Sequence, residues 1–407
     1  EPPMPGNALV GQSGGPTAVI NQTLIGVVTA ALADPAIDAV YGAVHGIRGI
    51  LDGDLCDLGR EAPETLEVVA RTPSSALLSV RLKPTEDICR RILERCKQLD
   101  VRYFFYIGGN DTAETTHIIN EMAADDGHPL RCFHCPKTID NDLRVTDHCP
   151  GYGSAARFVA QAFMGDNLDN RSLGGIKINV VMGRDAGWLT AASALARVFE
   201  DDGPHLIYCP ETDFDLDTFC ADVEAVYRRL GRCVVALSEG VHGPGGAPII
   251  DLGEVDSHGN RQLSGSGALG DALADRLKAH LAAAMPDTAH RVRADTFGYL
   301  QRCFPGVVSE VDAAEARLAG TAAVAAATGG EHPSGSIAFR RAAGDDYAIE
   351  TFVTPLASVA KDTRSMPRDW FNAAGNDVVA ERLLPYLRPL VGELPPVGRL
   401  AMHRIPL

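Results

Sequence analysis

Short, continuous apolar runs recur along the chain, and each ends in a glycine or a charged turn. They occupy residues 8–10, 101–107, 176–182, 205–209 and 233–237. Strands that are buried on both faces have this appearance, and segments with helical periodicity lie between them. The pattern therefore predicts parallel sheets covered by helices. Ligands bind such sheets at the carboxyl ends of the strands, where these turns lie.

Apolar positions at helical spacing predict two helices between the strands. One covers residues 113–124, with Ile118, Ile119 and Met122 on one face, and the other covers residues 186–199, with Leu189, Leu195 and Val198 on one face. Such stripes are typical of helices that pack one face against a sheet.

Helix caps support these boundaries and add a third helix. Asp111, followed three positions later by Glu114, resembles a capping box. Ser309, followed by Asp312, begins an alanine-rich helix that we expect to end at the glycine pair 329–330.

The length of the chain indicates more than one domain. At 407 residues with 45% hydrophobic content it can bury two or three sizeable cores. Breaks fall near residues 150–153 and 303–306, and neither is a long linker. We therefore expect two closely packed α/β domains with a cleft between them. The Pro- and Gly-rich residues 242–248 are expected to form a surface loop.

The net charge limits the classes of partner. A formal charge of −16 and a pI near 5.2 argue against nucleic acid held on a general basic surface, so an anionic substrate needs a local site. No apolar run approaches the length of about 20 residues needed for a membrane span, and residues 1–6 lack the core of a signal peptide. These features predict a soluble cytoplasmic protein.

The ten cysteines fall at irregular spacings, several of them inside apolar runs, and are expected to be reduced core residues. A zinc site is one alternative, with Cys132, His134, Cys135, His148 and Cys149 as the candidate ligands. A second properly spaced pair is missing, however, and the first of these segments resembles a strand running into Pro136.

Two short runs carry the strongest chemical signal. In the first, Gly108 and Gly109 precede Asn110 and Asp111 where a strand gives way to a helix, and backbone N–H groups at such a turn can face a phosphate. An earlier glycine turn, at Gly14–Gly15, could approach an anion in the same way, although such turns are common for steric reasons alone.

The second run places Lys137 beside Asp140 and Asp142. Phosphoryl transfer needs a cation that neutralises charge and a carboxylate that accepts a hydroxyl proton, and Asp140 is the candidate base. Thr138 and Asp142 could position it. The alternative is an Asp-Asn-Asp turn without chemistry.

Further charged residues follow predicted strands or lie near them. Arginine suits phosphate because its planar fork binds two oxygens at once, and the candidates are Arg81, Arg184, Arg293 and Arg302. Each could instead be a solvated surface charge. Glu239 could accept hydrogen bonds from sugar hydroxyls, or it could cap a helix.

Taken together and in this order, the turns resemble the motifs of the phosphofructokinase family, and within it the pyrophosphate-dependent branch. The resemblance covers residues from Val10 to about Asp369 and rests on these segments: residues 13–15 with Asn21, 108–112, 138–142, 182–184, 238–240 and 298–302. It implies two three-layer α/β/α domains with mainly parallel sheets and an active site in the cleft between them. The donor domain would comprise residues 1–150 plus about 306–345, and the sugar-phosphate domain residues 151–305 plus about 346–407.

The resemblance also implies roles for individual residues. Asp140 would be the base that acts on the 1-hydroxyl of fructose 6-phosphate, with Thr138 nearby. The sugar would be held by Met182, Gly183, Arg184 and Glu239, and its 6-phosphate by Arg293, Tyr299 and Arg302. The donor would lie against Gly14, Gly15, Arg81, Gly109, Asn110, Asp111 and Lys137.

Two positions bear on the choice of donor. Family members that use ATP carry glycine where this chain has Asp111 and Lys137. A carboxylate near a helix N-terminus occupies an anion position that a nucleotide phosphate would otherwise use, and Lys137 can bind pyrophosphate oxygens.

Two other positions depart from the family pattern. Asn110 replaces an aspartate associated with magnesium, and a neutral amide is a weaker partner for a hard dication. Gly175 stands where the bacterial ATP enzymes place an arginine that reaches into the neighbouring subunit's sugar site, and Arg171 or Lys177 could substitute for it.

The function implied is reversible phosphoryl transfer from pyrophosphate to fructose 6-phosphate, with Mg²⁺ as cofactor and a homodimer or homotetramer as the assembly. Sedoheptulose 7-phosphate is a further possible acceptor because its ketose end is similar. The alternatives are an ATP-dependent phosphofructokinase and a non-catalytic regulatory subunit that binds sugar phosphates.

Overall fold

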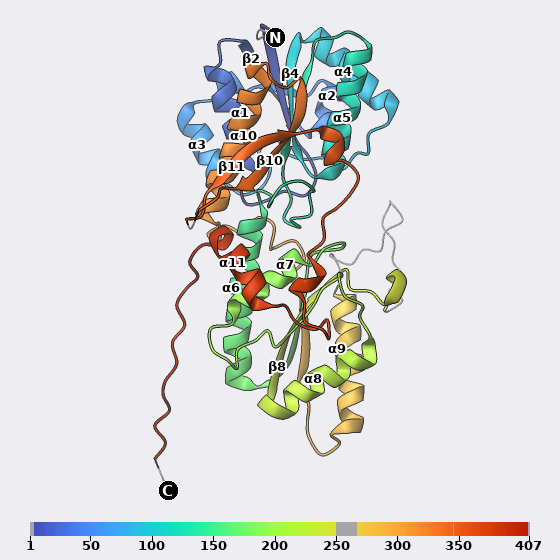
Figure 1. Ribbon diagram of the computed structural model, residues 1–407, viewed down its shortest axis with the longest axis vertical. Coiled ribbons are helices and arrows are strands. Elements are labelled where there is room, and N and C mark those ends of the chain that lie inside the picture. The colour runs from blue at the N-terminus through green and yellow to red at the C-terminus, as the bar shows by residue number, and fades with distance from the viewer. Residues whose placement is uncertain (1–3, 250–266, 345, 406–407) are drawn as a thin grey trace.

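The structure is a computed structural model that describes residues 4–249, 267–344 and 346–405. It contains two sheets with helices on both faces of each (Figure 1). The first sheet has the strand order β11-β10-β5-β4-β1-β2-β3. Its strands are β1 (Gly6–Gln12), β2 (Ile37–Ala43), β3 (Leu55–Asp57), β4 (Val101–Gly108), β5 (Arg131–Pro136), β10 (Ser334–Arg341) and β11 (Ile349–Thr354).

Helices cover both faces of the first sheet. Alternate residues of β4 point to opposite faces: Tyr103 and Phe105 pack into one core, and Phe104 and Tyr106 into the other. On the Tyr103 face lie α1 (Ile20–Ala33), α3 (Pro63–Arg71) and α10 (Glu310–Gly329); on the other face lie α2 (Ile47–Asp52), α4 (Glu86–Gln98) and α5 (Asn110–Asp125). This arrangement makes the first domain three-layered.

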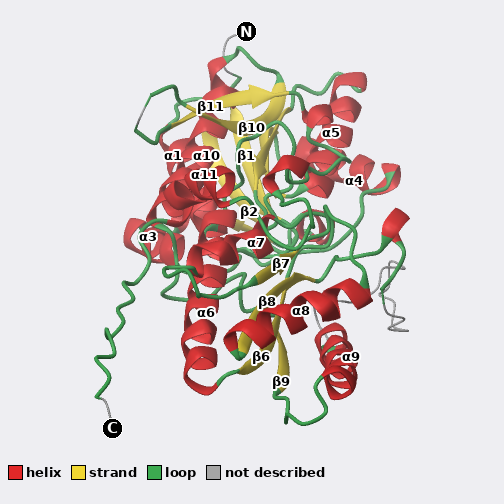
Figure 2. Cartoon of the chain, turned by 60° about the horizontal axis from the view of Figure 1, so that its bottom comes forward, coloured by secondary structure: helices red, strands yellow, loops and turns green. Residues whose placement is uncertain are grey.

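The second sheet has the order β7-β8-β6-β9 and is parallel throughout the residues described. Its strands are β6 (Gly175–Val181), β7 (Leu206–Tyr208), β8 (Arg232–Ser238) and β9 (Val292–Thr296). One face packs on α8 (Leu216–Leu230) and α9 (Ala268–Ala284), and the other on α6 (Tyr152–Leu173), α7 (Trp188–Ala191) and α11 (Ala380–Val391). Figure 2 shows β6, β8 and β9 between α6 on one side and α8 and α9 on the other.

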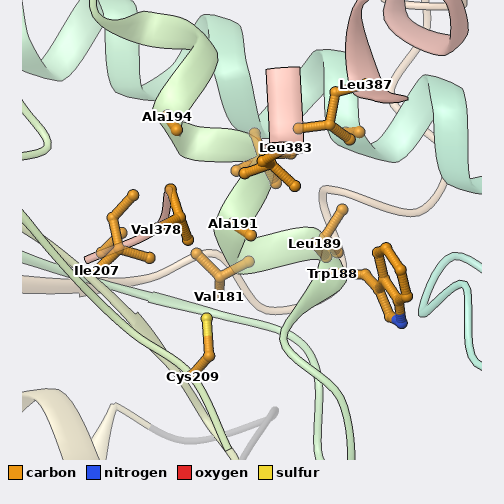
Figure 3. Packing of buried hydrophobic residues seen from close by; sticks show 14 of the residues in the cluster. Val181, Trp188, Leu189, Ala191, Ala194, Ile207, Cys209, Val378, Leu383 and Leu387 are labelled. Atoms are coloured by element: carbon orange, nitrogen blue, oxygen red, sulfur yellow. The ribbon is translucent and has the colours of Figure 1, made fainter. Parts of the chain in front are cut away.

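A buried cluster joins the second sheet to α7 and α11. Val181 and Ile207 reach up from the strands toward Leu189 of α7 and Leu383 of α11, and all four are fully buried (Figure 3). Burying a side chain of this size stabilises the fold by about 1.5–3 kcal/mol. The chain therefore returns from the first domain at its C-terminal end to complete the core of the second.

The predicted fold class is confirmed, and every predicted strand forms a strand within one or two residues of the expected position. The helix at residues 113–124 forms as α5, and the alanine-rich helix forms as α10, where the Ser309 side chain accepts a hydrogen bond from the Asp312 backbone N–H. Residues 244–248 are exposed, as expected of a surface loop. No helix among the described residues has the length and apolarity needed to cross a bilayer.

The single helix expected over residues 186–199 is wrong. The structure has only α7, followed by a 3₁₀ helix (Ala192–Ala196), and Val198 is exposed. The Asp202 carboxylate accepts hydrogen bonds from the backbone N–H groups of Val198 and Phe199, which turns the chain away. These bonds replace helical ones only at the last two residues of the expected helix, because the change to a 3₁₀ helix comes already at Ala192.

The first sheet also extends beyond the residue expected to end the first domain. We expected the crossing at about residue 345, but β11 pairs antiparallel with β10 and keeps the chain in the first sheet to Thr354. The added strand covers the edge of β10, which would otherwise present unpaired backbone groups.

Candidate active site

A cavity of about 390 Å³ lies where turns from both sheets meet. The turns after β1, β4 and β5 supply one wall and the turn after β6 supplies another, as ligand sites at the carboxyl ends of parallel strands require. Its polar or glycine lining consists of Ser13, Gly14, Gly15, Arg81, Lys83, Gly109, Asn110, Asp111, Thr112, Lys137, Thr138, Asp140, Arg184 and Arg302. Residues predicted for the donor and for the sugar therefore share one cavity.

Lys137 is packed against the first glycine turn. Its side chain is buried, and Nζ donates a hydrogen bond to the Gly15 carbonyl oxygen at 2.7 Å. A Cβ atom at Gly14 would lie 3.0 Å from that Nζ, and one at Gly15 would lie 3.0 Å from the guanidinium carbon of Arg302. The two glycines are therefore needed for the close approach of these cations.

The environment of Lys137 weakens its hold on a proton. Burial lowers the pKa of the ammonium to about 7, the guanidinium of Arg302 acts in the same direction, and the carboxylate of Asp140 opposes it. An anion placed beside Lys137 would restore the charged form.

Asp140 is the buried carboxylate of the cavity. Its Oδ1 is buried and has no hydrogen-bond partner within the described ranges, while its backbone N–H donates to Thr138 Oγ1 at 3.1 Å. Burial raises the pKa of the Asp140 carboxyl to about 7, and the nearby carboxylates of Asp142 and Glu239 add to this shift. The group can therefore take up a proton near neutral pH.

Asp142 lies beside this carboxylate but does not line the cavity. Burial raises the pKa of its carboxyl group, while a hydrogen bond from the Thr138 side chain lowers it. Thr138 therefore contacts both acidic residues of the run, through its oxygen to the Asp140 backbone and through its side chain to Asp142.

The capping box expected at Asp111 does not form. Gly109 is the N-cap of α5, and no side chain caps it. Asp111 lies in the first turn of the helix, where its backbone N–H donates to Asn110 Oδ1 at 3.0 Å. The turn after β4 is a single residue long, so the helix begins earlier than predicted. The Asp111 carboxylate still lines the cavity near the positive end of the helix.

The turn after β6 supplies the second wall. Met182 and Arg184 line the cavity, and Gly183, between them, donates its backbone N–H to Glu239 Oε1 at 3.2 Å. Gly183 and Glu239 therefore support this wall from behind. Arg302 completes it, with its guanidinium 4.6 Å from the ring centre of Tyr299, whose side chain is exposed.

Arg293 lies apart from the other predicted residues. It is exposed near the start of β9, pairs in register with Lys177, and lines a separate small hollow. Five residues separate Lys177 from Met182 along β6, which is about 16 Å at the rise of a strand. Arg293 therefore does not reach the cavity of its own chain.

Lys83 is a cavity residue that the sequence motifs did not single out. It lies two positions after Arg81 in a segment that is neither helix nor strand, and both residues line the cavity. That spacing was the signal that could have found it.

The histidines considered for zinc have other partners. His134 contacts the Ser336 hydroxyl and the Gly108 carbonyl oxygen, each at 2.8 Å. His148 lies between the carboxylates of Asp147 and Glu315. In the part of the chain that the structure describes, no group of three or more His, Cys, Asp or Glu side chains is arranged to hold a metal ion.

Comparisons with known proteins agree with this geometry. The family model described as Phosphofructokinase matches residues 7–327. The chain is 52% identical to a pyrophosphate–fructose 6-phosphate 1-phosphotransferase of Rhodospirillum rubrum, over 98% of each chain. It is 38% identical to the protein of the same name from Halomonas elongata, over 98% of this chain and 97% of that one.

A solved structure shows the same fold. The pyrophosphate-dependent phosphofructokinase from Marinobacter aquaeolei superposes with a TM-score of 0.84 at 32% identity, covering 97% of this chain and 94% of that one.

Proposed function

This chain belongs to the phosphofructokinase family, and from that premise we propose that it transfers a phosphoryl group reversibly from pyrophosphate to the 1-hydroxyl of fructose 6-phosphate. The products are fructose 1,6-bisphosphate and phosphate. The observation that supports the proposal is that Asp140 and Lys137 line the same cavity. The Asp140 carboxylate has a buried oxygen without a hydrogen-bond partner among the described residues, and Lys137 is only 4% exposed.

Asp140 is the proposed base. As the phosphoryl group arrives, the 1-hydroxyl proton passes to the Asp140 carboxylate, the new P–O bond forms to the sugar oxygen, and the bond to the departing phosphate breaks. Lys137, Arg81 and Arg184 neutralise charge on the transferring group and on the phosphate that leaves. Thr138, whose Oγ1 accepts a hydrogen bond from the Asp140 backbone N–H, is proposed to position the base, and the nearby Asp142 carboxylate helps to raise the pKa of the base.

The sugar is proposed to lie against Met182, Gly183 and Glu239. Arg302, with Tyr299 stacked on it, is the proposed ligand of the 6-phosphate within the same chain. The glycines at residues 14, 15 and 109 let the donor approach the backbone closely.

Donor choice is proposed to rest on Asp111 and Lys137. The exposed Asp111 carboxylate lies where α5 would attract a nucleotide phosphate, so like charge excludes the longer donor. Lys137 compensates by binding pyrophosphate.

Magnesium is the proposed cofactor, bound together with the donor. Mg²⁺ keeps several waters and takes substrate phosphate oxygens as ligands, so it needs few protein ligands. Asn110 lines the cavity and would hold the ion through its amide oxygen, which suits a magnesium–pyrophosphate complex better than a free ion. When bound, the ion neutralises charge on the phosphate oxygens.

We also propose a homodimer or homotetramer that works in the cytoplasm. All ten cysteines are unpaired, as in proteins of reducing compartments, which supports that location.

A donor comparison tests the proposed function. Purified protein is assayed with fructose 6-phosphate and either pyrophosphate or ATP, and turnover is expected with pyrophosphate. Asp111→Gly is expected to admit ATP, and Lys137→Gly to lower turnover with pyrophosphate. Preferential use of ATP by the unaltered protein would reject our assignment of donor choice, and no turnover with either donor would favour the regulatory-subunit alternative.

A second test addresses the base. Asp140→Asn is expected to lower kcat by about 100- to 10,000-fold with little change in the KM for the sugar. Near-normal turnover would remove Asp140 from its role.

A further inference from the structure

The loop that carries Asp140 and Asp142 needs support from outside its own segment. Residues 137–150 contain neither helix nor strand. Within them Asn141 is fully buried and adopts a left-handed backbone conformation with φ 56°. Asparagine adopts this conformation more readily than most residues with a side chain, so the chain turns sharply here at little cost.

A segment from far along the chain supplies this support. Thr363 forms an isolated antiparallel bridge with Leu143, and the Arg364 backbone N–H donates to the Asp142 carbonyl oxygen at 2.7 Å. The Arg364 backbone is thus bonded to Asp142, two positions after Asp140 in the loop.

The Arg364 guanidinium binds three more carbonyl oxygens of the same loop. Its terminal nitrogens donate to Asn141 at 2.8 Å, to Thr146 at 2.8 Å and to Asp147 at 2.7 Å. The planar fork of an arginine can reach these divergent acceptors together, whereas the single ammonium of a lysine cannot.

Trp188 fixes the orientation of the guanidinium. The Arg364 guanidinium carbon lies 4.7 Å from the ring centre of Trp188, and the indole N–H donates to the Arg364 carbonyl oxygen at 3.1 Å. An arginine held on an aromatic face keeps its fork in one plane. The Arg364 side chain is half-buried, and its terminal nitrogens donate to backbone carbonyl oxygens of the loop. The guanidinium therefore stabilises the backbone of this loop.

We propose that Arg364 is a positioning residue for phosphoryl transfer, which acts by holding the loop that presents Asp140 to the acceptor hydroxyl. This inference rests on the proposed function. Removal of the guanidinium leaves carbonyl oxygens of the loop without their donors, and the loop relaxes away from its reactive geometry. A displacement of about 1 Å at a reacting group can cost about 100-fold in rate.

The chain offers a matched control in Arg341. This arginine donates to the Asp147 carboxylate at 3.0 Å and to the Tyr386 carbonyl oxygen at 2.7 Å, so it binds the same region. It contacts neither Asn141 nor Asp142 in any hydrogen bond that the structure shows among described residues. A general loss of packing would affect both arginine variants alike.

The test compares Arg364→Ala, Arg364→Lys and Arg341→Ala in the intact chain, after wild-type turnover with pyrophosphate has been measured. Arg364→Ala is expected to lower kcat by about 100-fold with KM values for both substrates little changed, and Arg364→Lys to recover only part of the loss. Added guanidinium at millimolar concentration is expected to restore turnover to Arg364→Ala. Arg341→Ala is expected to keep kcat.

Two kinetic results would overturn the proposal: a folded Arg364→Ala variant with unchanged kcat, or an equal loss of kcat in Arg341→Ala. If the wild-type protein has no turnover, the proposed function has failed, and amide hydrogen exchange then decides about Arg364. Faster exchange in residues 139–149 of Arg364→Ala than of Arg341→Ala supports the role of Arg364 in holding this loop, and equal exchange rejects that role.

Discussion

At the scale of single residues, Lys137 shows how burial can bring the pKa of a lysine close to physiological pH, so that its charge depends on what binds beside it. Burial lowers the pKa of its ammonium to about 7, and Arg302 and Arg81 add to this shift while Asp140 and Asp142 oppose it, so an appreciable fraction is neutral at physiological pH. Pyrophosphate would add negative charge beside the ammonium and raise its pKa. Binding of the donor should therefore take up a proton.

This uptake is the first prediction. Calorimetric titration of the protein with pyrophosphate at about pH 8, in buffers of different ionisation enthalpy, should show protons taken from the buffer. Lys137→Met should abolish the uptake, while Asp140→Asn should leave it in place, because the Asp140 carboxyl remains mostly ionised at that pH. Uptake that persists in Lys137→Met would assign the proton to another group.

At the scale of elements, Gly151 is the junction between α6 and two other parts of the fold. It is the N-cap of α6 with φ 104°, and a Cβ atom there would lie 2.7 Å from the Thr17 side chain. The Asp312 carboxylate of α10 accepts hydrogen bonds from the backbone N–H groups of Gly151 and Ser154, at 2.9 Å each.

The second prediction is that Gly151→Ala destabilises the protein by about 1–3 kcal/mol, through backbone strain and the clash with Thr17. Urea unfolding measures the loss. Gly127→Ala is the matched control, since Gly127 has φ 72° but a Cβ atom there would meet no described atom within 4 Å. A smaller loss is expected in the control, because Gly127 has neither the clash nor a φ as far from the left-handed region, and equal losses would show that the contact with Thr17 contributes nothing.

A buried histidine links the loop after β5 to α10. His148 Nδ1 lies 2.8 Å from Asp147 Oδ2, and its Nε2 lies 2.5 Å from Glu315 Oε2. Burial opposes the charged imidazolium, but the hydrogen bonds and charges of the two carboxylates outweigh it and raise the His148 pKa. Arg341 and Tyr347 complete the surroundings through Asp147 and Glu315.

The third prediction follows from the sign of that shift. A raised pKa means that the charged histidine stabilises the fold fully below its unfolded value of about 6.5, and that this contribution is lost as the pH rises through the folded value. The difference in free energy of unfolding between wild type and His148→Gln should therefore be largest below about pH 6.5 and shrink above it. A difference that grows with pH would contradict the raised pKa.

At the scale of the whole molecule, the position of Arg293 requires a second copy if this residue binds the sugar phosphate. It faces away from the cavity of its own chain, near the opposite end of β6 from Met182. In a symmetric dimer, a residue on such an exposed edge can reach the site of the partner.

The fourth prediction tests this placement by complementation. Asp140→Asn and Arg293→Ala should each be nearly inactive alone. In random mixed dimers one site combines an intact Asp140 with an Arg293 from the other chain, so co-expression should restore about a quarter of wild-type activity. Light scattering verifies that mixed oligomers form. Mixed dimers without restored activity, or an active Arg293→Ala variant, would place Arg293 outside the site.

Local sequence patterns were enough to predict the class of fold and the buried strands β1, β4, β6, β7 and β8, because these depend on apolar runs and turns. Val101–Gly108 and Glu310–Gly329 are examples, since the signals for their burial and caps lie within a few residues. The strands β2, β3, β9, β10 and β11 were not predicted. Lys83 could have been found by its spacing from Arg81. The helix expected over residues 186–199 failed because α7 gives way to a 3₁₀ helix after Ala191, and the backbone N–H groups of Val198 and Phe199 bond to the Asp202 side chain.

Which distant groups share an environment depends, by contrast, on how the elements pack within and between the domains. Packing buries Lys137 against Gly15, separates Arg293 from Arg302, and brings Arg364 onto the loop of Asp140 and Asp142. The physical reason is that burial and electrostatic interaction depend on distance in space, whereas sequence patterns report only on neighbours along the chain. Local patterns determine the secondary-structure elements and the residue types of the site. Tertiary packing determines which of these residues lie together and which of them are charged.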